Sequence, residues 1–101
     1  MTEEDRRSEP DFTNVRFNAT SESADILITA NSAVNRVIGW HSEQLGYERR
    51  AGEPNHERMA ELKEGLTQAQ ADRRSIPLAD DEQRQRLIDE YSALYRRLAA
   101  E

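Results

Sequence analysis

The two histidines are the first candidates for a functional site in this sequence, because histidine commonly serves as an acid, a base or a metal ligand at neutral pH. His41 and His56 are separated by 15 positions, and neither belongs to a His-Glu-x-x-His zinc motif. His56-Glu57 is typical of a helix start, and His41 falls on the apolar face of a predicted helix. We therefore expect both histidines to have structural or surface roles, and we expect no metal site.

Paired carboxylates are the second possible source of chemistry. Glu61 and Glu64 share one predicted helix, and Asp89 and Glu90 share another. General acid–base catalysis needs two carboxyl groups whose environments separate their pKa values, whereas charged helices carry such pairs on solvated faces. The sequence also has no cysteine, no Gly-rich phosphate loop and no nucleophile elbow. We expect a protein that is not an enzyme, with no catalytic residue and no cofactor.

Length and composition limit the class of protein further. The chain has 101 residues, 36% of them hydrophobic and 34% charged, which fits one domain with a modest core. A net charge of -6 disfavours direct binding to nucleic acid or to an anionic membrane, and a basic or neutral protein partner fits better. Neither a signal peptide nor an apolar run of membrane-spanning length is found. These features favour a cytoplasmic protein.

The first 19 residues differ from the rest in composition. Residues 1–11 are mostly charged, so we expect residues 1–19 to form a disordered or extended, flexible acidic N-terminal arm. Val15 and Phe17 alternate with polar residues as in a short strand, but one strand has no partner in this chain. The segment is expected to pack in extended form against the helices or against another protein. Arg6 and Arg7 lie in the arm and are candidate partner contacts.

Residues 20–101 contain three stretches with apolar residues at helical spacing. The predicted helices are about 20–50, 55–75 and 80–100. Their apolar ladders are Leu27, Ala30, Val34, Val37, Ile38, His41 and Leu45; Met59, Leu62, Leu66 and Ala69; and Leu87, Ile88, Tyr91, Leu94, Tyr95 and Leu98. Asn55 and Asp80 are predicted N-caps, with Gln83 completing a capping box. An Arg-Arg pair closes each helix, where cations complement the helix dipole.

Short links between these helices favour antiparallel neighbours. The predicted fold is all-α, a small three-helix bundle with a flexible N-terminal arm. A helical hairpin that dimerises and a bundle that a partner completes both remain open, so a homodimer or a heterocomplex is possible. A small acidic helical chain without catalytic motifs indicates a protein that acts by binding another protein. Trp40, Tyr91 and Tyr95 are candidate contacts, because a small core can leave some aromatic residues for a partner.

The segment from Ser32 to Ile38, Ser-Ala-Val-Asn-Arg-Val-Ile, resembles the first-helix segment of the epsilon-type antitoxins that neutralise zeta toxins. The order of the helices is similar as well. The resemblance implies an inhibitor of a nucleotide-using kinase toxin in a toxin–antitoxin system, with the first helix obstructing the ATP-binding side of the toxin. It also implies that Asn35 and Arg36, on the outer face of that helix, make steric and electrostatic contacts with the toxin.

Two other classes of binding protein are compatible with the sequence. An acidic phage-encoded inhibitor of a defence enzyme would have the same composition, and its target could be a basic protein. Secreted proteins of the WXG100 group are also about this long and helical, with Trp-x-Gly in a hairpin turn. Here Trp40 is followed by His41 and Ser42, and two prolines divide the chain into three helices and not two.

Overall fold

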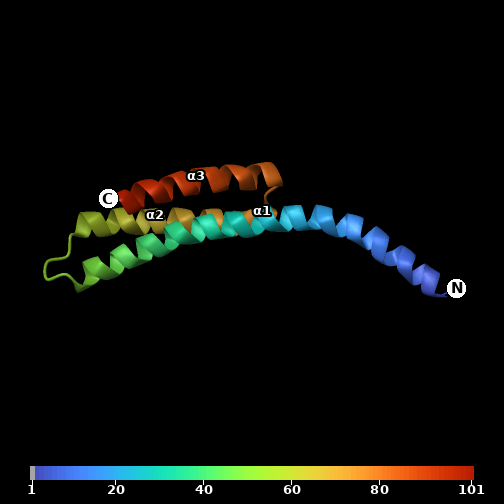
Figure 1. Ribbon diagram of the computed structural model, residues 1–101. Helices are drawn as coiled ribbons and strands as arrows, with labels where there is room; N and C mark the ends of the chain where they lie inside the picture. Colours follow the sequence, from blue (N-terminus) through green and yellow to red (C-terminus); the bar gives the residue numbers. More distant parts are fainter. Residues whose placement is uncertain (1) are drawn as a thin grey trace.

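The computed structural model describes the backbone of residues 2–101 and the side chains of residues 22–101. Within residues 2–101 the chain forms three α-helices and one short 3-10 helix, without a strand (Figure 1). The elements are α1 (Thr2–Arg50), α2 (His56–Ser75), η1 (Ile76–Leu78) and α3 (Asp81–Ala100). The predicted all-α three-helix bundle is therefore confirmed.

The first helix is longer than the sequence predicts. α1 has 49 residues and begins at Thr2, not near residue 20, so the strand-like alternation of Val15 and Phe17 lies inside a helix. Residues 11–38 contain no glycine or proline to interrupt the helix, whereas Pro10 near its start has no N–H group to donate to the hydrogen-bond ladder. Figure 1 shows α1 continuing past the bundle toward the N-terminus, and the molecule measures 76 × 24 × 23 Å. The division into an arm and a helical domain stays a prediction.

Both shorter helices start at the predicted caps. The Asn55 side chain accepts a hydrogen bond from the backbone N–H of Arg58 at 3.0 Å. The Asp80 carboxylate accepts from the backbone N–H of Gln83 at 2.8 Å, and Gln83 Oε1 accepts from the backbone N–H of Asp80 at 3.0 Å. The predicted capping box is thus confirmed, and these bonds satisfy amide donors that the first helical turn leaves unpaired.

α1 is the helix that the other two share. α2 runs antiparallel to α1, and α3 runs parallel to it, since Ser23 lies beside Asp81 and Arg36 lies beside Tyr95 (Figure 1). Close backbone approach is extensive between α1 and α2 and between α1 and α3, but slight between α2 and α3. The bundle therefore depends on one face of α1 to hold both neighbours.

The core consists mainly of small side chains from α1. The buried residues of α1 are Ala30, Ala33, Val34, Val37, His41 and Leu45, and the others are Leu62, Ala69, Ile76 and Tyr91. Alanine and valine let helix axes approach closely, because short side chains leave little volume to fill between them. On α3 only Tyr91 is buried, and Leu87, Ile88, Leu94, Tyr95 and Leu98 pack around the core half-buried. The predicted core faces are confirmed.

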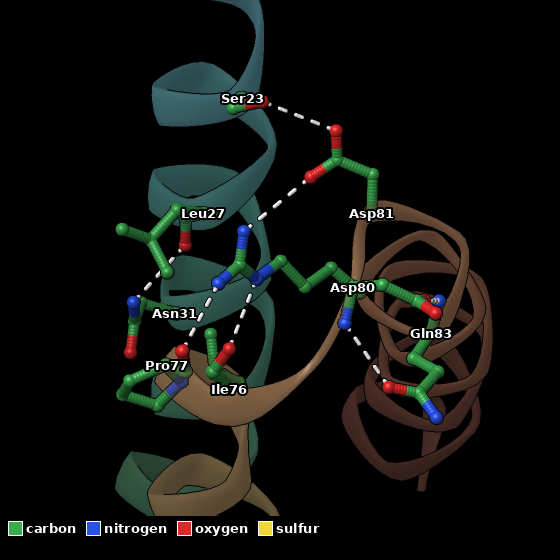
Figure 2. A network of polar contacts seen from close by, with 9 residues as sticks. Ser23, Leu27, Asn31, Ile76, Pro77, Asp80, Asp81 and Gln83 are labelled. Carbon is green, nitrogen blue, oxygen red and sulfur yellow. Dashed lines mark hydrogen bonds and ion pairs between the residues drawn. The ribbon is translucent and has the colours of Figure 1, made fainter. Parts of the chain in front are cut away.

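A network of polar contacts fixes the turn between η1 and α3 (Figure 2). The Arg84 guanidinium donates to the carbonyl oxygens of Ile76 at 2.9 Å and Pro77 at 3.3 Å, and it pairs with Asp81 at 3.3 Å. Asp81 in turn accepts from the Ser23 hydroxyl of α1 at 3.2 Å. One arginine thereby satisfies two backbone carbonyls of the short helix and links it to α3.

Candidate protein-binding surface

His41 lies at the contact between α1 and α2. Its side chain is 8% exposed, and Nδ1 is 2.9 Å from the carbonyl oxygen of Val37, to which it donates. A Cβ atom at Gly65 of α2 would stand 2.3 Å from His41 Nε2, so only glycine leaves room for the ring. His56 is exposed at the first position of α2. The contacts of His41 are those of a packing residue.

Tyr91 connects α3 to α2 inside the bundle. Its hydroxyl donates a short hydrogen bond to the Asp72 carboxylate, and the residue is 6% exposed. Burial raises the pKa of Tyr91 well above its ordinary value of 10.0, and the hydrogen bond and negative charge of Asp72 raise it further. Tyr91 was predicted from the sequence to contact a partner, but the structure places it in the core.

Two adjacent residues of α1 turn toward the two neighbouring helices. The Asn35 side-chain oxygen accepts a hydrogen bond from Arg73 Nη1 of α2 at 3.0 Å. The Arg36 guanidinium lies 5.9 Å from the ring centroid of Tyr95 on α3, at cation–π distance. Asn35, Arg36 and Arg73 are exposed, and Tyr95 is half-buried. The structure thus brings together three predicted contact residues, Asn35, Arg36 and Tyr95, and adds Arg73.

Trp40 lies apart from this group. Its ring meets His41 edge-on at 5.1 Å between centroids, and the Arg58 guanidinium of α2 lies 5.8 Å from the Trp40 ring. The half-buried indole therefore fills the edge of the contact between α1 and α2. Trp40 is inside α1 and not in the turn after Arg50, unlike the tryptophan of WXG100 proteins. The side chains of Arg6 and Arg7 lie outside the described residues.

A hollow of about 320 Å³ opens beside η1 and the first half of α3. Its lining combines apolar side chains with a polar rim and consists of Ser75, Leu78, Ala79, Gln83, Arg86, Leu87 and Glu90. Leu78 is 90% exposed, the highest value among the large apolar side chains described as exposed. Isolated apolar residues on a surface are common, but one beside a hollow can anchor a partner.

Sequence reasoning missed both Leu78 and Arg73 as candidate contacts. Leu78 has a signal in the sequence, since it is an apolar residue after Pro77 in a link that belongs to no apolar ladder. Arg73 was assigned only to the end of a helix. The sequence also indicates that Arg73 is free to contact another helix or a partner, because the positions three and four residues away carry no carboxylate that could pair with it along the helix.

The described part of the chain has neither a metal-binding cluster nor a membrane-spanning helix. No group of three or more His, Asp or Glu residues there could hold a metal ion. Among the described residues, no helix combines the length and hydropathy needed to span a bilayer. Comparisons with known protein-family models, with curated proteins and with solved structures found no match to this chain. The similarity to epsilon-type antitoxins therefore stays a prediction.

Proposed function

We propose that this chain is a non-enzymatic protein-binding module. The observation that carries the proposal is Leu78, which is 90% exposed at the hollow beside η1, while the polar side chains around it hold the turn in place. Burying a leucine side chain in an interface contributes about 1.5–3 kcal/mol. An apolar side chain on a fixed turn next to a hollow is the arrangement of an interface anchor, since the hollow can accept an apolar side chain of the partner in return.

The target in this proposal is an enzyme that the module inhibits, in the manner of an antitoxin, in the cytoplasm. The outer face of α1 supports this mode of action, because α2 and α3 cover only its inner face. Of the segment that resembles epsilon-type antitoxins, Ala33, Val34 and Val37 form the core, whereas Ser32, Asn35 and Arg36 are exposed. A rigid helix with this exposed row can obstruct an active site sterically, without chemistry of its own.

Co-expression with the product of the neighbouring gene tests the proposal. We expect rescue of growth from the toxic partner and a stable complex on size-exclusion chromatography. Leu78→Glu should weaken the complex, because it puts a charge in the interface. Thr67→Glu, on the exposed face of α2, is the matched control and should leave the complex intact. Absence of both rescue and complex would show that this pair is not an antitoxin and its toxin.

A further inference from the structure

Arg36 and Arg73 are positioned by neutral groups. Arg73 donates to the Asn35 amide oxygen, and Arg36 lies over the Tyr95 ring. The ion pairs identified within residues 22–101 involve other arginines, Arg84 with Asp81 and Arg86 with Glu82. Residues three and four positions away from Arg36 are serine, alanine, glycine and tryptophan, so no carboxylate on the same helix neutralises it. Both guanidinium groups therefore keep their full positive charge at the surface.

Other arginines lie at the same level of the bundle. The contact of Asn35 with Arg73 and that of Arg36 with Tyr95 align the end of α2 and the end of α3 with the middle of α1. Arg74 follows Arg73 in the chain, and Arg96 and Arg97 follow Tyr95. We name this set the arginine band; its members are Arg36, Arg73, Arg74, Arg96 and Arg97, and all five are exposed. Three helices thus place exposed arginines at one level along the bundle, in a chain whose net charge is -6.

The carboxylate adjacent to the band in sequence is occupied elsewhere. Asp72 accepts hydrogen bonds from Tyr91 and from the Gln68 side chain. The negative charge of Asp72 is therefore engaged at the contact between α2 and α3. The ion pairs found within residues 22–101 do not involve the band, and the attraction of an anionic partner to it remains available.

The way these arginines are held leaves donors for a ligand. The Arg36 guanidinium lies 5.9 Å from the Tyr95 ring centroid, and the hydrogen bonds found within residues 22–101 do not use its N–H groups, so these donors can serve a ligand. Arg73 spends one nitrogen on Asn35 and retains the rest. Carboxylates match the fork of a guanidinium with two parallel hydrogen bonds. Each side chain already has one contact that favours this position, Asn35 for Arg73 and Tyr95 for Arg36.

We infer that the arginine band is the contact site for an acidic segment of the protein partner, an assignment that rests on the proposed function. The positive charge of the band favours an acidic partner segment, although the negative net charge of the whole chain favours a basic or neutral partner. Nucleic acid is a less suitable ligand than an acidic peptide, because the phosphates of a long strand would also lie near the acidic parts of the surface and be repelled by them. An Asp- or Glu-rich segment can match the band alone. Exposed pairs of this kind are weak individually, and loss of one arginine should reduce affinity about two- to fivefold.

Nuclear magnetic resonance of the full chain tests the assignment. The probe is a synthetic peptide that repeats Glu-Ala-Ala-Ala, and its control has Gln in place of each Glu. We expect the Glu peptide to shift the Nε–Hε signals of Arg36 and Arg73, and we expect added salt to weaken binding. The double variant Arg36→Gln, Arg73→Gln should bind about tenfold more weakly, by combination of the two single effects. Arg36→Lys should retain part of the binding.

Arg86→Gln is the matched control, because it removes the same charge from an arginine that Glu82 already pairs. The assignment is overturned if this variant loses as much affinity as the double variant, if the Gln peptide binds equally well, or if an oligonucleotide binds more tightly than the Glu peptide. Far-ultraviolet circular dichroism confirms that each variant is folded. A stable partner complex that is insensitive to Arg36 and Arg73 would refute this inference and leave the proposed function standing, whereas failure to form any complex counts against the proposed function itself.

Discussion

Tyr91 and Tyr95 stand one helical turn apart on α3, yet they belong to regions with opposite properties. Tyr91 lies in a region that we call the inner seam. The seam consists of two contacts between helices, that of Tyr91 with Asp72 and that of His41 with Gly65. Tyr95 lies at the edge of the arginine band, where Arg36 covers its ring. In the seam, a polar group has one fixed partner. In the band, the charged groups are exposed to solvent.

The difference shows how burial determines the role of a polar side chain. A buried hydroxyl or imidazole must find a partner inside the fold, because an unsatisfied polar group in the core is costly. The same requirement makes the seam a structural element. An exposed guanidinium is solvated by water, so it needs no charged partner within the fold. Three pairs of substitutions and one change of pH compare enclosed positions with exposed ones.

Truncation of the two tyrosines should give the largest contrast. Tyr91→Ala removes a buried ring and leaves a cavity beside Asp72, and we expect it to lower the free energy of unfolding by about 3 kcal/mol. Tyr95→Ala removes a half-buried ring and should lower it by about 1 kcal/mol. Urea unfolding followed by circular dichroism measures both values. Equal losses would mean that the seam is no more important to stability than the edge of the band.

Two arginines of α3 provide the second contrast. Arg84→Gln breaks charge-assisted bonds to the carbonyl oxygens of Ile76 and Pro77, and the expected loss is about 1.5–2 kcal/mol. Arg86→Gln breaks an exposed pair with Glu82 at 3.8 Å and should change stability by less than about 0.5 kcal/mol. Thermal unfolding of both variants checks the order. A larger loss for Arg86→Gln would contradict it.

Two glycines should respond with opposite signs. Gly65→Ala places a Cβ against the His41 ring, so we expect a net loss of about 1–2 kcal/mol despite the better helix propensity of alanine. Gly39→Ala meets no atom within 4 Å on the exposed face of α1 and should stabilise the helix by about 0.5–1 kcal/mol. The midpoint of urea unfolding distinguishes them. A stabilising Gly65→Ala would show that His41 can move aside.

Alkaline pH should weaken the seam through Tyr91. The folded state raises the pKa of Tyr91 above the ordinary 10.0, so the unfolded chain loses this proton first as the pH rises. The stability that Tyr91 contributes is therefore complete below pH 10 and declines above it, by about 1 kcal/mol for each pH unit. Unfolding measured at pH 9, 10 and 11 tests this. Tyr91→Phe should lack this decline, and an unchanged slope in that variant would assign it to other groups.

The sequence was sufficient to predict the fold class, the ends of α2 and α3, and the buried face of each helix. Those features depend on neighbours within one or two helical turns, as in the Asp80–Gln83 capping box. The structure begins α1 at Thr2, well before the predicted start near residue 20, and the separate N-terminal arm stays a prediction. Of the candidate contact surface, Asn35, Arg36 and Tyr95 were predicted and Arg73 was not. The pairing of Arg73 with Asn35 and of Tyr95 with Arg36 depends on how the helices align.

The sequence determines the local features of this protein, and the tertiary structure determines how its helices align. The sequence by itself determined three amphipathic helices, their caps and a thin core of small residues, since helical periodicity and end effects are local. Only the tertiary structure decided that Tyr91 is buried while Tyr95 is not, and that arginines from three helices lie at one level. Helix alignment is set by close packing around α1, including the single position where His41 fits over Gly65. No local pattern encodes that geometry, because each contact joins residues that are far apart in the chain.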